Sequence, residues 1–396
     1  MPITPRLLQW LQSDDAASWL KQLTASPPTD AELLAVLAQL RIHFSLPQAS
    51  ALVTTARLRE HAQHKFGAMA TKMFFSEIGL QQASPWPVAR YTAQRYASFS
   101  QVADLGCGLG TDSIALATTG LRVLAVDRSP LAVALTQANA RALELDANIM
   151  PVQADITAPA WELAVAWADP GRRSEGRRIF NPDSLQPPLS YLLELQQKGV
   201  PHLGIKLMPG LSHQRIPPMA EAEWISLHGE LKEVVLWFGD LVVSSGRRAT
   251  VLPAGISLWA RGEKARVHPP AEFFFEPDPA VIRAGAVSDL ALQLGLWQVD
   301  PKIAYLSGDE AVSTPLARVW RIIEHHPFDL KWLNKRLRAL QAQVVAVKKR
   351  GSPIEPETFR KRLFRQQNGR EVILFITRVL NRPWMLITES PPFAMP

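Results

Sequence analysis

The chain has 396 residues, 47% of them hydrophobic and 20% charged, which is enough for two to four domains with sizeable cores. Its single cysteine, Cys107, excludes a disulfide framework and favours a reducing, cytoplasmic compartment. No apolar run approaches the ~18 residues that cross a bilayer, and residues 1–12 lack a signal-peptide pattern, so we expect no membrane association.

The positive charge is concentrated at the C-terminus. The formal net charge of the whole chain is +7, whereas residues 327–396 alone contain 14 Lys and Arg against 5 Asp and Glu. The remaining residues are therefore slightly acidic in sum. This distribution predicts a module at the C-terminus that binds a polyanion.

The N-terminal region is predicted to be helical. Apolar residues recur at three- and four-residue spacing over 6–11, 16–23, 30–41 and 46–61. Another amphipathic helix is expected over 86–96, as the first helix of the domain that follows. These helices carry no motif that indicates a function.

A glycine-rich turn stands at the centre of the chain. An apolar strand, 101–105, runs into Gly106, Gly108 and Gly110, which open a helix over 110–119. Glycines at alternate positions allow a sharp bend and a close approach to a ligand. The dinucleotide pattern G-x-G-x-x-G is not met, because Thr111 holds the sixth position and Asp104 would repel a pyrophosphate.

Strands and helices alternate after this turn, which predicts a mostly parallel α/β sheet with its ligand at the carboxyl ends of the strands. The strands are expected over 101–105, 121–126, 149–154, 163–168, 202–207, 224–227, 234–238 and 250–258. The first four end at an acidic residue. These residues are Asp104, Asp127, Asp155 and Asp169.

The D-x-G-x-G-x-G pattern resembles the cofactor loop of the Rossmann-like S-adenosylmethionine (SAM) methyltransferases. SAM carries an ammonium and a sulfonium but no phosphate, so acids suit it. We expect Asp104 to face the ammonium, Asp127 to accept both ribose hydroxyls with its two oxygens, and Asp155 to accept from the adenine amino group. Together with Gly106, Gly108 and Gly110 they form the predicted cofactor site.

Asp169 and Pro170 are the predicted catalytic residues. Methyltransferases that act on amines carry an acid or amide and a proline after this strand, often followed by an aromatic residue. A carboxylate oxygen and the next backbone carbonyl can accept two N–H bonds of an exocyclic amine and aim its lone pair at the methyl group. Here Gly171 and Arg172 replace the aromatic residue, which leaves the target atom open.

Several basic residues are candidates for binding substrate phosphates. Arg172 and Arg173 open an arginine-rich loop, for which a merely solvated surface is the alternative. Near the C-terminus the spacing places Lys331, Lys335 and Arg338 on one helical face. The other phosphate-binding candidates are Lys206, Lys348, Lys349 and Arg350.

Two chemistries are disfavoured. Methylation at C5 of a pyrimidine usually needs a cysteine nucleophile, and Cys107 lies inside the glycine turn. The nine histidines show no spacing typical of metal ligands, so no metal site is expected.

A larger set of motifs resembles a bacterial family of class I SAM-dependent methyltransferases with a C-terminal THUMP-like domain. The likeness covers roughly residues 60–390 and implies a SAM enzyme joined to a ferredoxin-like segment and an RNA-binding-like module. The matching motifs are 104–110, 126–127, 154–155, 168–173, 205–210, 276–279 and 347–351.

We therefore expect a Rossmann-like domain with a mostly parallel seven-stranded sheet over 65–261, after a helical region over 1–64. A small α/β domain over 262–325 and a basic THUMP-like domain over 326–396 would follow. The hypothesis is a SAM-dependent methyltransferase that modifies a base nitrogen in tRNA or rRNA. A methyltransferase of small molecules or proteins, and a non-catalytic SAM- and RNA-binding protein, are the alternatives. The target RNA and the oligomeric state stay open.

Overall fold

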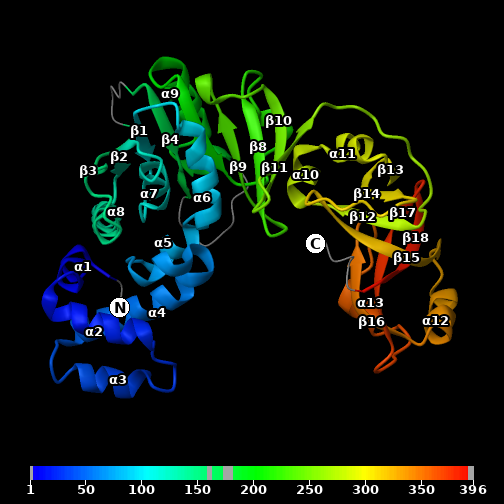
Figure 1. Ribbon diagram of the computed structural model, residues 1–396, viewed down its shortest axis with the longest axis horizontal. Coiled ribbons are helices and arrows are strands. Elements are labelled where there is room, and N and C mark those ends of the chain that lie inside the picture. The colour runs from blue at the N-terminus through cyan, green and yellow to red at the C-terminus, as the bar shows by residue number, and fades with distance from the viewer. Residues whose placement is uncertain (1–2, 158–162, 173–181, 391–396) are drawn as a thin grey trace. The chain divides into compact units, whose positions relative to one another are not determined.

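The computed structural model describes residues 3–157, 163–172 and 182–390, with Arg172 described by its backbone alone. The chain forms two compact units, Met1–Glu221 with Val234–Ser245, and Ala222–Glu233 with Gly246–Pro396. Figure 1 gives the order of the elements along the chain. The four-part division expected from the sequence stays a prediction.

Helices fill the N-terminal part of the first unit, as the apolar spacing predicted. The long helix α4 begins after Ser45, whose backbone N–H donates to the side chain of Gln48 at 3.0 Å. No described helix has both the length and the apolar character that a membrane crossing needs. The helical elements are α1 (Pro5–Leu11), α2 (Asp14–Ala25), α3 (Leu33–Leu40), α4 (Leu46–Phe66), η1 (Gly67–Thr71), α5 (Glu77–Gln82), α6 (Trp86–Ala93) and η2 (Gln94–Tyr96).

The sheet of the first unit has five parallel strands and confirms the predicted α/β class. They are β1 (Gln101–Leu105), β2 (Arg122–Asp127), β3 (Ile149–Gln153), β4 (Val165–Ala168) and β7 (His202–Leu207). The helices α7 (Thr111–Ala117), α8 (Pro130–Ala142) and α9 (Leu189–Lys198) connect them. A short hairpin pairs β5 (Gly171–Arg172) with β6 (Leu185–Gln186).

The order of the strands fixes where a ligand can bind. The predicted seven-stranded sheet has the order β8-β9-β7-β4-β1-β2-β3, with β8 (Glu221–Leu227) and β9 (Glu230–Trp237) shared between the units. The chain leaves β1 toward β2 and β3 on one side and returns to β4 and β7 on the other. Ligands of such sheets bind at this reversal, at the carboxyl ends of β1 and β4.

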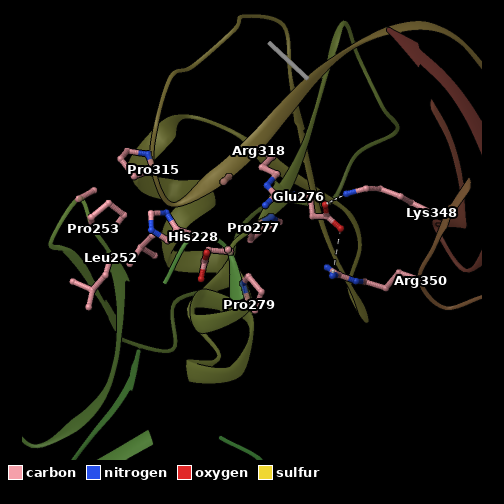
Figure 2. A pocket seen from close by; sticks show the side chains of 15 residues that line it. His228, Leu252, Pro253, Glu276, Pro277, Pro279, Pro315, Arg318, Lys348 and Arg350 are labelled. Atoms are coloured by element: carbon pink, nitrogen blue, oxygen red, sulfur yellow. Dashed lines mark hydrogen bonds and ion pairs between the residues drawn. The ribbon is translucent and has the colours of Figure 1, made fainter. Parts of the chain in front are cut away.

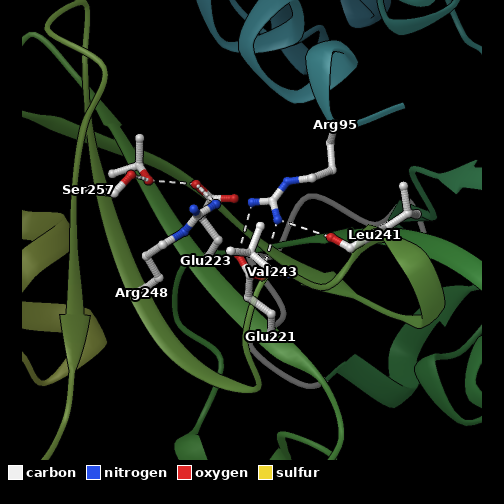
Figure 3. A network of polar contacts seen from close by, with 8 residues as sticks. Arg95, Glu221, Glu223, Leu241, Val243, Arg248 and Ser257 are labelled. Carbon is white, nitrogen blue, oxygen red and sulfur yellow. Dashed lines mark hydrogen bonds and ion pairs between the residues drawn. The ribbon is translucent and has the colours of Figure 1, made fainter. Parts of the chain in front are cut away.

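Two buried carboxylates of β8 are each compensated by an arginine (Figure 3). In the first unit Arg95 pairs with Glu221 at 2.9 Å and also donates to the carbonyl of Leu241 at 3.0 Å. In the second unit Arg248 pairs with Glu223 at 2.7 Å. Because both glutamates are fully buried, each carboxylate depends on its partner to offset the cost of desolvation.

The second unit contains two further strands of the first sheet, where the sequence predicted one strand over 250–258. These are β10 (Gly246–Leu252) and β11 (Ile256–Ala260), which pair antiparallel, so the one predicted strand is in fact two. The sheet has nine strands rather than the expected seven. The correction has a simple cause, because Leu252 and Ile256 flank a turn containing Pro253 and Gly255 that interrupts the apolar run.

A seven-stranded sheet forms the rest of this unit. Its order is β13-β14-β12-β15-β18-β17-β16, and its core contains the aromatic rings of Phe274, Tyr305, Trp320 and Phe375. The strands are β12 (Phe273–Pro277), β13 (Trp297–Asp300), β14 (Ile303–Gly308), β15 (Ala317–Pro327), β16 (Ala342–Lys349), β17 (Arg370–Val379) and β18 (Arg382–Glu389). The helices are α10 (Pro279–Ala284), α11 (Val287–Leu294), α12 (Leu330–Ala339) and α13 (Pro356–Arg360).

Candidate functional site

The glycine turn after β1 adopts the backbone that its sequence requires. Gly106, Gly108 and Gly110 have φ angles of +98°, +56° and +80°, a region that other residues rarely enter. A Cβ on Gly106 would lie 2.6 Å from the carbonyl oxygen of Asp169, and one on Gly110 2.9 Å from Thr136. A Cβ on Gly108 would meet nothing within 4 Å. Gly106 and Gly110 are therefore needed for packing, whereas Gly108 borders open space.

The first two strands place their acids beside this turn. Asp104 lies in β1 and pairs in register with Ala125 of β2. Asp127 ends β2, and its carboxylate accepts from the backbone N–H of Gly108 at 3.1 Å and of Ser129 at 2.8 Å. Asp127 thus ties the carboxyl end of β2 to the glycine turn.

Asp155 differs from the other predicted acids because it is exposed. It follows β3, and one carboxylate oxygen accepts from the backbone and the hydroxyl of Thr157 at 2.8 and 2.7 Å. These hydrogen bonds lower the pKa of Asp155, so its carboxylate is charged at neutral pH.

Asp104 is almost fully buried and only half satisfied. One oxygen accepts from the hydroxyl of Ser113, while the other, Oδ1, has no hydrogen-bond partner among the described residues. Burial raises the pKa of Asp104, and the nearby carboxyl of Asp112 raises it further. A buried carboxylate oxygen without a donor is costly unless a cation or donor meets it.

Lys206, at the end of β7, lies among these acids. Its ammonium donates to Asp169 at 2.7 Å and to the hydroxyl of Ser84 at 2.8 Å, and lies 4.0 Å from Asp112. The side chain is 13% exposed, so its charge faces the acid cluster. Lys206, a predicted phosphate-binding residue, here offsets the negative charge next to Asp169.

Three further residues, none of them a predicted site residue, shape this site. Asp112 and Ser84 are the other neighbours of Lys206, and the place of Asp112 in the first turn of α7 was a usable signal. Asn139 is fully buried in α8 and donates to the carbonyls of Leu109 and Phe74 at 2.8 and 3.0 Å. It fixes the glycine turn, and nothing in its sequence context indicates this.

Cys107 is buried within the turn. Burial raises the pKa of its thiol, and Sγ accepts from the hydroxyl of Thr136 at 3.4 Å. A neutral, enclosed thiol is a poor nucleophile, in line with the argument against methylation at pyrimidine C5.

The remaining candidates have different surroundings. Pro170 is buried directly after Asp169, and the backbone of Arg172 in β5 pairs with Leu185 of β6. Arg173 lies outside the described residues. In the second unit Lys348 contacts Glu276, Lys349 lies 3.4 Å from Glu355, and Arg350 lies 3.8 Å from Glu276.

The predicted basic face of α12 is exposed. Lys331, Lys335 and Arg338 face solvent, while Leu333 and Leu337 of the same helix are fully buried. Within the described part of the chain, none of these three cations makes an ion pair. Their charge is therefore available to a partner.

Known proteins match both parts of the chain. Residues 102–166 match the family described as a methyltransferase domain, and residues 317–390 match the THUMP domain-like family. An uncharacterised S-adenosylmethionine-dependent methyltransferase of Mycobacterium tuberculosis strain CDC 1551 / Oshkosh is 35% identical over 338 residues, which covers 83% of this chain and 92% of that protein. The chain belongs to the SAM-dependent methyltransferases.

Further comparisons agree with this family. The corresponding protein of Mycobacterium tuberculosis strain H37Rv shows the same 35% identity over the same shares of both chains. A crystal structure assigned as a methyltransferase from Porphyromonas gingivalis W83 superposes with a TM-score of 0.74 at 18% identity, covers 92% of this chain and 100% of that one, and shares the fold. The predicted class I methyltransferase family with a C-terminal THUMP-like domain is confirmed.

The cofactor of this methyltransferase is SAM, which supplies an electrophilic methyl group on a sulfonium. The site fits such a molecule on two observations. Oδ1 of Asp104 is buried without a donor, which suits an ammonium, and Gly108 borders open space, which a ligand can enter.

Proposed function

We propose that this methyltransferase modifies a nitrogen of a base in structured RNA, either tRNA or rRNA, in the cytoplasm. The observation that carries the proposal is the charge of the THUMP-like segment. Residues 317–390 contain 16 Lys and Arg against 6 Asp and Glu, on a chain with a net charge of only +7. A methyl donor site joined to a cationic module suits a polyanionic substrate.

In this proposal the acids and glycines at the carboxyl ends of β1, β2 and β3 hold SAM. Asp104 meets the ammonium, Asp127 the ribose hydroxyls and Asp155 the adenine amino group. The turn of Gly106, Gly108 and Gly110 gives the cofactor its close approach. The support is that Asp104 and Asp127 both contact the segment that follows β1, through Ser113 and Gly108.

Asp169 and Pro170 orient the acceptor nitrogen. The Asp169 side chain is 32% exposed, so one carboxylate oxygen can accept an N–H of the acceptor while Lys206 holds the other. Lys206 is then a positioning residue that fixes the rotamer of Asp169. No strong base is required, because the sulfonium is a good leaving group and the proton of the acceptor can leave after transfer.

Phosphates of the RNA bind outside this centre. We assign them to Arg172 and Arg173, which follow Asp169 and Pro170 in the sequence, and to Lys348, Lys349 and Arg350 in the second unit. We add the exposed cations of α12, because they make no ion pair in the described part of the chain.

The test is methyl transfer to RNA. The full chain is incubated with methyl-labelled SAM and total RNA from cells that lack the protein. The RNA is then digested, and its nucleosides are separated and identified by mass spectrometry. We expect label in an N-methylated nucleoside. Label found only in protein or small molecules would refute the RNA substrate and favour the alternative methyltransferase.

A charge-reversal variant sharpens this test. Lys331→Glu, Lys335→Glu and Arg338→Glu together should weaken RNA binding and flatten the dependence of log K on log salt by roughly 2–3. Lys21→Glu, Arg90→Glu and Arg141→Glu reverse three exposed cations of the first unit and serve as the matched control. Equal losses of RNA affinity in the two triple variants would mean that RNA binding depends on net charge alone and not on the face of α12.

A further inference from the structure

A pocket of about 460 Å³ in the second unit brings together two of the sequence motifs that carry the family resemblance (Figure 2). The Glu276-Pro277-Asp278-Pro279 segment is the first of them and lines the pocket with all four residues. Lys348 and Arg350 of the second motif reach it from β16 and the residue after it. His228 and Arg318 come from two other segments. Residues 251–254 complete the lining, so five segments distant in sequence converge on one cavity.

The cations of the pocket are held in place before any ligand arrives. Lys348 lies 4.6 Å from the ring centroid of Trp320, and the guanidinium of Arg350 lies 4.7 Å from that of Tyr305. Both cations contact the single carboxylate of Glu276, as the dashed lines in Figure 2 show. An ammonium has three N–H donors and a guanidinium has five, so donors remain for an incoming acceptor.

Arg318 adds a third permanent cation. It makes no hydrogen bond or ion pair with any described residue, and its Nη2 would lie 2.5 Å from a Cβ placed on Gly229. The His228-Gly229 turn between β8 and β9 has φ angles of +53° and +78°, so the glycine lets the guanidinium lie against the backbone. Arg318 is therefore packed at the rim with its donors available.

The balance of charge favours an anion. Three permanent cations line the pocket against two carboxyls, Glu276 and Asp278. Glu276 is shared by Lys348 and Arg350, and Asp278 already accepts from the backbone N–H of Ala280 at 2.8 Å. The three permanent cations thus outnumber the two carboxyls, and the pocket is positive in sum.

The walls indicate what is attached to the anion. Pro253, Pro277, Pro279 and Pro315 line the pocket together with Leu252, and rigid apolar walls of this kind pack against flat rings or sugars. The volume lies within the range of small-ligand sites and exceeds the need of a lone phosphate. A phosphate joined to a ribose and a base satisfies both the cations and the apolar walls.

We propose that this pocket holds one phosphorylated nucleotide unit, with its phosphate on Arg318, Lys348 and Arg350 and its base or ribose against the proline walls. The inference rests on the proposed function for the choice of a nucleotide, and places one contact of that substrate in the second unit. The unit can come from an RNA strand or from a free nucleotide.

Binding is measured by calorimetry with the full chain and without SAM, so the result does not depend on methyl transfer. The probes are AMP, adenosine, inorganic phosphate, and a short oligoribonucleotide with either a 5′-phosphate or a 5′-hydroxyl. We expect AMP to bind more tightly than adenosine or phosphate. A preference for the 5′-phosphorylated oligonucleotide indicates a strand end, equal binding of the two indicates an internal phosphate, and binding of AMP alone indicates a free nucleotide.

Arg318→Gln should weaken this binding about tenfold or more, because a charged hydrogen bond to phosphate is lost. The matched control is Arg321→Gln on the same strand, which removes an exposed arginine paired with Glu272 outside the pocket. Lys348→Met removes a second of the three cations and should also weaken the binding of AMP. The proposal is overturned if neither AMP nor the oligonucleotides bind, if adenosine binds as well as AMP, or if Arg321→Gln weakens binding as much as Arg318→Gln.

Discussion

Asp104 links the stability of the first unit to cofactor binding. Because burial raises the pKa of Asp104, its protonated form contributes stability that is fully present below the unfolded pKa of about 3.9 and is lost as the pH rises through the folded pKa. Above the unfolded pKa, the burial of Asp104 thus lowers the free energy of unfolding until a cation meets the carboxylate. A strongly perturbed pKa of this kind is typical of a binding site, where a buried group is left without its partner until the ligand binds.

Asp104→Asn removes that charge and keeps the shape of the side chain. We expect the melting temperature without SAM to rise by about 2–4 °C at pH 7.5, the shift that ~1 kcal/mol causes in a unit of this size, and the gain to vanish below about pH 4. The dissociation constant of SAM should rise about tenfold or more. Thermal melts and calorimetry check this, with exposed Asp146→Asn as the control. Unchanged SAM affinity would contradict the assignment.

Lys206 is expected to act on the rate more than on cofactor affinity. Lys206→Met leaves Asp169 and Asp112 without their ammonium, so kcat for methyl transfer should fall by about 10–100-fold while the SAM dissociation constant changes little. Burial raises the pKa of Asp112 and the ammonium of Lys206 opposes that rise, so the variant should raise the pKa of Asp112 further. Lys206→Arg should restore part of the rate. Lys198→Met, which removes an exposed lysine of α9, should leave both measurements unchanged.

At the scale of elements, the glycine turn separates stability from binding. Gly106→Ala places a methyl group 2.6 Å from a backbone oxygen at a left-handed φ, so it should lower the free energy of unfolding by about 2–4 kcal/mol. Gly108→Ala meets only open space and should cost about 1–2 kcal/mol, yet its methyl group should abolish SAM binding. Urea unfolding and calorimetry distinguish the two. Equal stability losses would contradict the packing argument.

The sequence predicted the elements of the first unit wherever apolar patterning and turn residues agreed. β1 and β7 have the predicted bounds, because each is a buried apolar run with clear ends. β8 begins three residues before its predicted start at Trp224. Glu221 and Glu223 make this segment look exposed in the sequence, but both are buried and form ion pairs with arginines outside the strand. Such distant partners leave no trace in local sequence.

The candidate site was predicted only in part, because some of its contacts also join residues that are distant in sequence. Local motifs indicated the glycines and the acids at the strand ends. The ion pair of Lys206 with Asp169 joins β7 to the residue after β4. The hydrogen bond that Asn139 donates to the carbonyl of Phe74 joins α8 to a segment 65 residues earlier. Residues 262–325 gave mixed signals, because β15 is long and alternates irregularly with Arg321, Glu324 and His325 along its length.

At the scale of the whole molecule, two compact units predict unfolding that is not two-state. Differential scanning calorimetry should show two transitions. SAM at 100 times its dissociation constant stabilises the unit that binds it by about 2.7 kcal/mol, which corresponds to a shift of roughly 5–10 °C. Only the transition of the first unit should move. A shift of both by the same amount would place cofactor contacts in the second unit as well.

The division of β8 and β9 between the units limits how this enzyme can be divided into fragments. A stop codon after Ser245 would keep every residue of the first unit but would retain residues 222–233 of the second unit with it. No single protease cut can therefore release the second unit whole and free of residues of the first unit. A shuffled gene would have to exchange both stretches of the second unit together.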